Sequence, residues 1–165
     1  MNHTVKALLV AGSVFVFSSA FAEVKVGVVD LHQVLQQSSK ARAINQKLEQ
    51  DFKPRQQNIV GLQQQLRVDA DKLNKNANVL SASQKSELEN KIVKEKRDIQ
   101  NAGQAYQQDL SMAQNKAMQT FFVEVKKAVD QVANQGQYDL ILQKENVPFS
   151  AQKIDVTQQV IKVLG

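Results

Sequence analysis

Residues 40–135 form one long pattern of helix-favouring residues, and this feature constrains the fold more than any other. Apolar residues recur there at spacings of three and four, which is the narrow seam by which one helix packs against another. The stretch NVLSASQKSE (residues 78–87) is the clearest interruption, because Asn tolerates the left-handed conformation at a helix end and Ser81 can cap a following helix. A short connection between two long helices predicts antiparallel neighbours. We therefore expect a helical hairpin arm with its turn near residues 78–82, whose second helix would reach roughly 80 Å.

Two seams of apolar residues define the faces on which the two helices are expected to meet. Arg55 is the one residue that breaks the first series, and Gly136 is expected to end the second helix. The first seam consists of Ala41, Ile44, Leu48, Phe52, Ile59, Leu62, Leu66, Ala70, Leu73, Ala77 and Leu80. The second seam consists of Leu88, Ile92, Ile99, Ala102, Tyr106, Leu110, Ala113, Ala117, Phe121, Val125, Ala128 and Val132.

Three helix-weakening residues fall at one level of the arm. Pro54 removes a helix hydrogen bond, and Gly61 and Gly103 each cost about 1 kcal/mol relative to Ala inside a helix. With a turn near residue 80, Gly103 faces the segment between the other two. This placement predicts a bend or hinge at Pro54, Gly61 and Gly103; three unrelated, tolerated residues are the alternative.

The two ends of the chain carry strand patterns instead. VKVGVVD (residues 24–30) and YDLILQK (residues 138–144) are rich in β-branched and apolar residues and predict strands. VPFS (residues 147–150) could form a short third strand at an edge, because Pro148 has no N–H to donate. Asp30 is expected to cap the helix after the first strand, and Asp155 to cap a final helix through Leu164, with a Gln in the box position of each. The predicted fold class is therefore α+β.

Residues 23–39 and 136–165 together make a unit too small to be stable comfortably on its own. Its valine-rich strands would also leave edges open to pairing with other chains. Self-association answers both problems, so we expect these ends to form an oligomerisation body from which the arms project. The residues expected at the oligomer interface are Val24, Val26, Val28, Leu140, Leu142 and Ile161.

Residues 1–22 have the layout of a cleavable secretory signal peptide. A basic start at Lys6 precedes an apolar run from Ala7 to Phe17, and small residues surround a cleavage point before Glu23. A core helix or a retained anchor is the alternative. The whole chain lacks Cys, so an exported form must be stabilised by packing or assembly rather than by disulfides.

The sequence shows no constellation for catalysis or cofactor binding. After residue 22 there is one His, His32, expected at the surface or in packing, and there is no phosphate-binding loop. The acidic pairs Asp69/Asp71 and Glu87/Glu89 are two residues apart on a helix and do not share a face, so we interpret them as solvated charge. We expect no enzyme activity, no metal and no cofactor.

The arm is the basic part of the chain, with 16 Lys/Arg against 11 Asp/Glu in residues 40–135. Few aromatic residues accompany this charge and most lie on the seams, which, with export, argues against nucleic acid as a partner. An anionic membrane surface or lipopolysaccharide fits the charge better. A helix surface kept soluble by mixed charges is the simpler interpretation.

The chain resembles the Skp/OmpH family of periplasmic chaperones. The resemblance runs from VGVVDLHQVLQQS through the hairpin to QYDLILQKENVPFSAQKIDVTQQVIKVL, and it is most specific at DLHQVL and YDLIL…DVTQQVI. It implies a homotrimer with a shared β-barrel body and three helical arms around a cavity. It also implies ATP-independent holding of unfolded outer-membrane proteins in the periplasm. A lipopolysaccharide-binding cluster proposed in the family includes two adjacent arginines, and this chain has only Lys96-Arg97 there, so that site is not carried over.

Apolar residues off the two seams are the candidates for contact with an unfolded client. Isolated exposed apolar residues are common on soluble proteins, so the group carries the hypothesis rather than any single member. A coiled-coil spacer or adaptor with one fixed partner is the alternative function, and it would have a well-filled seam and a stiff arm. The candidate client-contacting residues are Val60, Val68, Val93, Met112, Met118 and Phe122.

Overall fold

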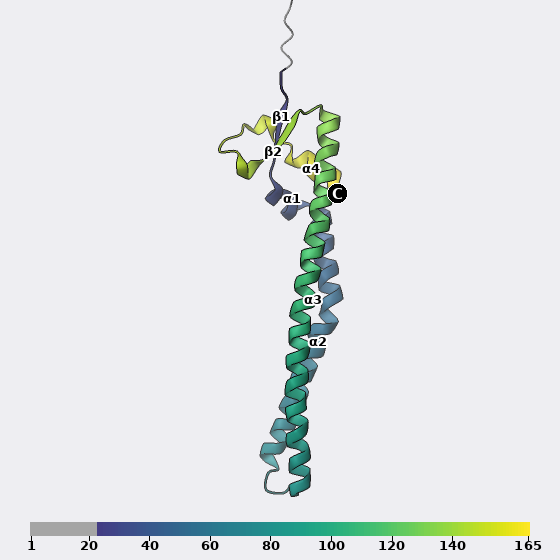
Figure 1. Ribbon diagram of the computed structural model, residues 1–165, viewed down its shortest axis with the longest axis vertical. Helices are drawn as coiled ribbons and strands as arrows, with labels where there is room; N and C mark the ends of the chain where they lie inside the picture. The colour runs from purple at the N-terminus through teal and green to yellow at the C-terminus, as the bar shows by residue number, and fades with distance from the viewer. Residues whose placement is uncertain (1–22) are drawn as a thin grey trace, which may run out of the picture.

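A computed structural model describes residues 23–165; the predicted signal peptide lies outside the described residues. One end of the molecule is a small body holding both strands, four short helical segments and the described ends of the chain (Figure 1). From this body a long pair of helices projects. Helix far exceeds strand, and the small sheet beside it confirms the α+β class.

The arm consists of α2 (Ser39–Lys75) and α3 (Ala82–Gly136), which lie side by side for the length of α2, and α3 then continues beside the body (Figure 1). Ion pairs join them near the tip, between Asp69 and Lys91, and near the body, between Lys40 and Glu124, so the helices run antiparallel. Ser81 starts α3 with a complete capping box, as the sequence predicts: its hydroxyl accepts from the Gln84 N–H, and its own N–H donates to the Gln84 side chain.

The seam predictions agree with the burial of the side chains. Every residue of the second seam is buried or half-buried, and so is every residue of the first except Ala77, which lies beyond the end of α2. The interpretation of Asp69 as solvated charge is wrong, because this residue is only 5% exposed. Asp71, Glu87 and Glu89 are exposed, as expected.

Helix ends differ from the prediction in one respect. Asn76 ends α2 without adopting the left-handed conformation (φ −107°). The left-handed residue is Gln137 (φ 52°), directly after Gly136, and the next N–H, that of Tyr138, donates to the Ala133 carbonyl. Gly136 lies close under the Tyr138 ring, so a Cβ there would force that ring to move.

The sheet has two parallel strands, β1 (Val26–Val29) and β2 (Leu140–Gln143), with Val26 opposite Leu140. The segment predicted as a third strand, residues 147–150, forms none; it links the 3-10 turns η1 (Lys144–Asn146) and η2 (Gln152–Ile154). Instead, an isolated bridge places Asp155 beside Val28.

Two short helices complete the body. The helix after the first strand is short: α1 (Leu31–Gln37) ends before Ser38, which caps the separate helix α2. Asp30 caps α1 as expected, accepting from the Gln33 N–H. The last helix, α4 (Thr157–Leu164), starts one residue later than Asp155 would place it, although the Asp155 carboxylate still accepts from the Thr157 N–H.

The core of the body extends into the base of the arm. Phe121 of α3 is 1% exposed and belongs to the same apolar cluster as Val34 of α1 and Val156 and Val160 at α4. The cluster continues along α3 through Val125, Ala128 and Val132. The body therefore completes its core with the last turns of α3, and this packing fixes the direction in which the arm projects.

Candidate functional site

All six off-seam apolar residues predicted for client contact are exposed. Their exposed fractions run from 39% for Met118 to 58% for Val60. Val79 in the turn and Val123 beside Phe122 are also exposed, and sequence reasoning missed both. The arm thus carries apolar side chains along its outer surface as well as in its seam.

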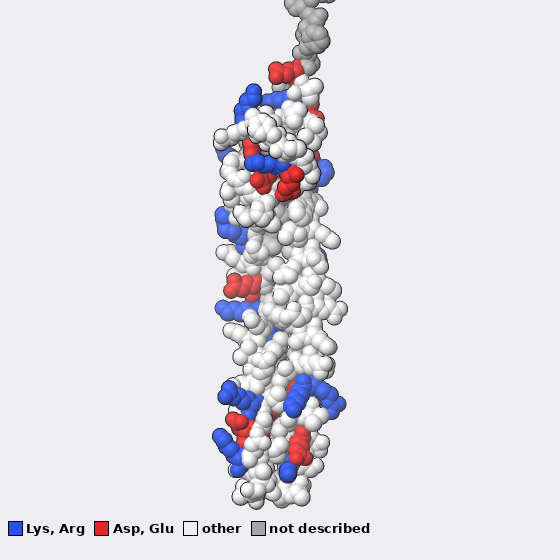
Figure 2. Space-filling view, turned by 90° about the vertical axis from the view of Figure 1, so that its left-hand side faces the viewer, with Lys and Arg blue, Asp and Glu red and all other residues white. Residues whose placement is uncertain are grey.

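Charge is distributed unevenly along the arm. In the face shown in Figure 2, charged side chains gather near the tip and on the body, and the length between them carries few. On α3 this is most pronounced in residues 99–123, where Asp109 and Lys116 are the only charged residues. We call residues 99–123 the low-charge band; Met112, Met118 and Phe122 all lie in it.

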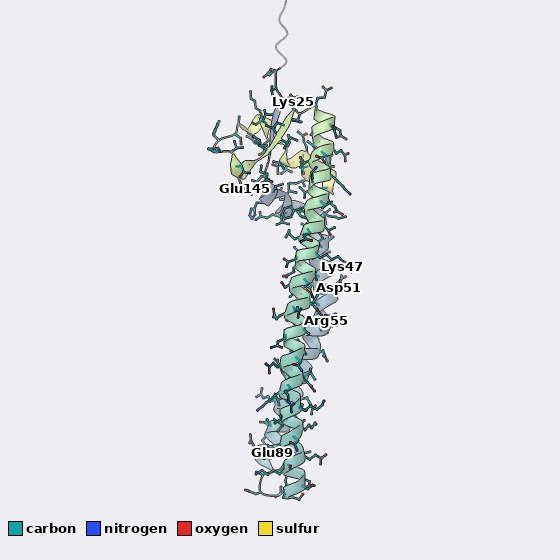
Figure 3. All side chains as sticks on the ribbon, in the orientation of Figure 1. Lys25, Lys47, Asp51, Arg55, Glu89 and Glu145 are labelled. Atoms are coloured by element: carbon teal, nitrogen blue, oxygen red, sulfur yellow. The ribbon has the colours of Figure 1, made fainter. Side chains whose placement is uncertain are left out.

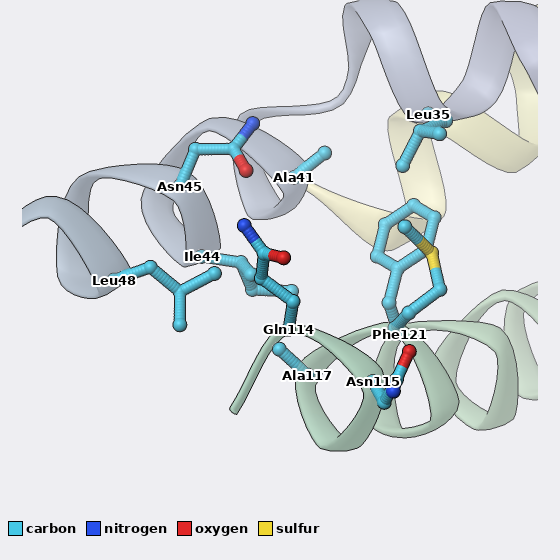
Figure 4. A pocket seen from close by; sticks show the side chains of 10 residues that line it. Leu35, Ala41, Ile44, Asn45, Leu48, Gln114, Asn115, Ala117 and Phe121 are labelled. Atoms are coloured by element: carbon cyan, nitrogen blue, oxygen red, sulfur yellow. The ribbon is translucent and has the colours of Figure 1, made fainter. Parts of the chain in front are cut away.

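A hollow of about 320 Å³ lies at the body end of the low-charge band. Figure 4 shows Leu35 from α1, Ile44 from α2 and Phe121 from α3 around it. Its polar lining is made only of side-chain amides, which can both donate and accept hydrogen bonds. Such a hollow can take an apolar side chain while the amides contact a passing peptide backbone. The amide-bearing residues are Asn45, Gln114 and Asn115.

At the predicted hinge, α2 stays continuous and side-chain contacts join it to α3. Helix α2 runs unbroken through Pro54, although the missing N–H leaves the Gln50 carbonyl without its helical donor. Arg55, midway along α2 (Figure 3), lies 2.6 Å from the Asp109 carboxylate across the seam. Phe52 and Tyr106 meet edge to face beside this pair, with ring centroids 5.9 Å apart.

Open space surrounds this level of the arm. A hollow of about 350 Å³ is lined by Pro54 and Asn58 of α2 and by Ala102 and Ala105 of α3. A Cβ added at Gly61 or Gly103 would meet no atom within 4 Å. Neither glycine is therefore needed for close packing. Each lowers helix stability without making room for a neighbouring atom of the chain.

The residues predicted for the oligomer interface divide into three groups. Val24, Leu140 and Leu142 are exposed, and Val26 and Ile161 are half-buried. Val28 does not fit the interface prediction, because its own chain leaves it only 1% exposed.

The most exposed large apolar residue of the body was missed by the sequence reasoning. Phe149 is 84% exposed, beside Pro148 in the loop that had been predicted as a strand. A Phe next to Pro in a predicted edge segment is the signal that could have identified it.

A polar cluster around one buried carboxylate, that of Asp69, lies in the seam near the tip of the arm. Asp69 accepts from the Gln65 amide at 2.9 Å, and Lys91 Nζ lies 2.7 Å from the same carboxylate and 3.8 Å from that of Glu95. We call Gln65, Asp69, Lys91 and Glu95 the tip cluster. Sequence spacing could have found it, because Asp69 and Glu95 each lie three residues after one seam residue and four before another.

The two carboxyl groups of the tip cluster differ in proton affinity. Hydrogen bonds from Lys91 and then Gln65 lower the pKa of Asp69 from 3.8 to about 2. Burial, followed by the hydrogen bond with Asp69, raises the pKa of Glu95 above its ordinary 4.5. The hydrogen bond to Asp69 also raises the pKa of Lys91. The cluster therefore favours an ionised Asp69 beside a Glu95 that keeps its proton to higher pH than usual.

Within residues 23–165, no three His, Cys, Asp or Glu side chains are grouped so that they could hold a metal ion. His32 is exposed and its Nε2 lies 2.8 Å from the Gln36 amide nitrogen. None of the described helices has an apolar stretch long enough to cross a membrane.

Comparison with known proteins places this architecture in a family. Residues 25–164 match the family described as outer membrane protein (OmpH-like), which spans the body and the whole arm. The chain belongs to the OmpH-like family. A crystal structure of an OmpH-like chain from Caulobacter crescentus has the same fold, with a TM-score of 0.78 over 87% of this chain and 85% of that one, at 17% sequence identity.

Curated relatives of this OmpH-like chain carry chaperone names. The Chaperone protein Skp of Yersinia enterocolitica is 27% identical over 145 residues, which cover 88% of each chain. The Skp-like protein of Pseudomonas aeruginosa is 23% identical over 162 residues, 98% of this chain and 96% of that one. Membership of the family predicted from DLHQVL and YDLIL…DVTQQVI is confirmed.

Proposed function

We propose that this OmpH-like chain is an ATP-independent holdase of the periplasm, which binds unfolded outer-membrane proteins and prevents their aggregation before insertion. The observation that carries the proposal is the low-charge band, where Met112, Met118 and Phe122 stand exposed and lead towards the apolar hollow at the base of the arm. The chaperone names of the relatives and the signal-peptide pattern of residues 1–22 support the same role and location.

The chemistry of the band suits such a client. A strand of an outer-membrane barrel is apolar at alternate positions, and in water its apolar faces aggregate. Shallow apolar contacts spread over a long arm bind many such strands weakly rather than one tightly. Met side chains adapt to differently shaped neighbours, which favours a broad client range. Several arms on one body would add these weak contacts through effective concentration, without nucleotide hydrolysis.

We further propose that three chains assemble through their bodies, with a shared β-barrel formed from the small sheets. Two features of one chain support this. A two-stranded sheet is marginal by itself, and in the described residues β2 pairs only with β1. Exposed apolar side chains of the body, Val24, Leu140, Leu142 and Phe149, need a cover. Partner strands would provide both the pairing and the cover.

Light scattering of a denatured β-barrel protein, diluted into buffer with and without this chain, tests the holdase role. We expect suppression of aggregation near one assembly per client, unaffected by ATP. Replacing Met112, Met118 and Phe122 together by Gln should weaken this suppression by about tenfold in the concentration needed, the effect of losing roughly 1.4 kcal/mol of binding free energy.

A matched control replaces three seam-remote polar residues outside the band, Gln63, Gln64 and Asn74, by Ala, and this variant should act as the wild type. All three are exposed on α2. Failure of the unmodified protein to protect several unrelated β-barrel clients would overturn the proposal.

The alternative function is a coiled-coil spacer or adaptor with one fixed partner. Two observations favour a stiffer arm than the sequence predicts. Helix α2 is unbroken at Pro54. Close by, the ion pair of Arg55 with Asp109 and the ring contact of Phe52 with Tyr106 join α2 to α3. An adaptor would ignore unrelated unfolded clients in the scattering assay, so the same experiment separates the two roles.

The distal arm offers a surface for an anionic partner, a membrane surface or lipopolysaccharide. Residues 67–97 carry eight Lys/Arg against five Asp/Glu. Lys75 and Lys85, exposed on either side of the turn, would meet such a surface first. This contact would attract the tip to a membrane surface and would weaken as salt is raised.

A further inference from the structure

The tip cluster occupies an unusual place in the arm. Between the tip and Phe121, the only buried residues of the two helices are Asp69 on α2 and Leu88 and Ile92 on α3. The half-buried seam residues of the distal arm are thus joined by two buried apolar side chains and one buried carboxylate. A change in the charge of the tip cluster therefore acts directly on the packing between the distal helices.

The charges within the tip cluster do not balance when every group is ionised. One ammonium, that of Lys91, serves two carboxyl groups, and it lies 2.7 Å from Asp69 but 3.8 Å from Glu95. The Glu95 Oε2 atom is buried and has no hydrogen-bond partner among residues 23–165. A protonated Glu95 could donate a hydrogen bond to the Asp69 carboxylate, whereas an ionised Glu95 would leave two negative groups in the seam and an acceptor without a donor.

Nearby groups do not supply the missing charge to Glu95. The hollow beside the cluster adds Lys72 of α2 and Glu87 of α3, which offset each other, next to Asp69 and Lys91. The Gln65 amide of α2 already donates to Asp69. Protonation is thus the available way to neutralise Glu95 in place.

We propose that the tip cluster is a pH-sensitive latch on the distal arm. With one proton held between Asp69 and Glu95 the latch keeps α2 and α3 together. With both carboxyl groups ionised it releases them, and the tip opens. If the arm holds clients as proposed above, the latch adjusts the opening through which a client passes, and this consequence alone rests on the proposed function.

The direction of the pH effect follows from the two proton affinities. Because the pKa of Glu95 is raised in the folded arm, its contribution to stability is present at low pH and is lost as pH rises through that raised pKa. Because the pKa of Asp69 is lowered to about 2, its contribution is present above its ordinary 3.8 and is lost as pH falls through 2. The latch is therefore tightest between the lowered pKa of Asp69 and the raised pKa of Glu95, and it loosens as pH rises through the latter.

Amide hydrogen exchange of the full exported chain in its assembled state tests the latch. The reporters are the amides of Leu88 and Ile92 in the distal arm, with those of Val125 and Val132 in the core at the base as an internal reference. After correction for the intrinsic pH dependence of exchange, the distal opening constant should rise with pH by up to about tenfold per unit, the limit for one released proton. The reference amides should not follow.

Two substitutions sharpen the test. E95Q keeps the shape of the neutral side chain, so its distal amides should stay protected and lose the pH response. E89Q, at an exposed glutamate near the tip (Figure 3), should keep the wild-type response. If the distal opening constant of the wild type stays the same from roughly pH 5 to pH 9, the proposal is overturned. This result needs no variant. Failure of the scattering assay with an intact pH response would instead reject the holdase role and leave the latch standing.

Discussion

Replacing Gly61 and Gly103 by Ala should stiffen the arm at the level where the sequence predicts a hinge. A helical glycine costs about 1 kcal/mol relative to Ala, because it loses more backbone freedom when the helix forms. The usual objection, that a new methyl group would clash, does not apply here: an added Cβ meets no atom within 4 Å at either position. The substitutions should therefore act through helix propensity alone.

The two changes together should raise the stability of each chain by about 2 kcal/mol. At about 2–4 °C per kcal/mol for a chain of this size, the melting temperature should rise by roughly 4–8 °C. If Pro54, Gly61 and Gly103 form a hinge, the stiffer arm should also lose capacity for large clients while keeping it for small ones.

Thermal unfolding followed by circular dichroism measures the first effect, and the scattering assay with β-barrel clients of different size measures the second. N90A is the matched control, since Asn90 is exposed on α3 away from the hinge level and Ala there should also stabilise the helix, by about 0.5 kcal/mol. A double variant that is less stable than the wild type would refute the packing argument. Equal loss of small and large clients, or loss in N90A as well, would refute the hinge.

Two further predictions concern the body. F121A should destabilise the chain by about 3–5 kcal/mol, seen as a lower midpoint in urea, because Phe121 fills the shared core, whereas F122A next to it should change the midpoint little because Phe122 is exposed. L142K should reduce the mass of the assembly measured by sedimentation, since a charge on the exposed strand β2 opposes pairing between chains; V79K in the exposed turn should leave the mass unchanged, and dissociation in both would contradict the proposed interface.

Much of the arm could be predicted because helix packing repeats. Seam residues such as Leu88 and Phe121 recur at fixed spacing, and Ser81 with Gln84 forms a local capping motif, so short-range patterns were sufficient. The burial of Asp69 was missed because a charged side chain was taken to be solvated, although its position in the repeat matches the seam. Asp69 is buried despite its charge, because Lys91 and Gln65 form an ion pair and a hydrogen bond with its carboxylate.

The body was harder to predict because its details depend on contacts between distant segments. The left-handed residue falls at Gln137, where the chain turns so that β2 can pair with β1, and not at Asn76. Residues 147–150 have the composition of a strand but no partner strand among residues 23–165. Thr157 accepts from the Asp30 N–H, a contact between opposite ends of the sequence that no local pattern indicates.

The central claim is that arms on a shared body hold an unfolded client, and the mass of the complex in solution tests it most directly. Sedimentation of the exported chain, alone and after dilution of one denatured β-barrel protein into it, gives both numbers in one experiment. We predict three times the chain mass alone, and that mass plus one client after mixing, at any ATP concentration. A single folded chain at dilute concentration, with the client sedimenting separately as an aggregate, would contradict the account.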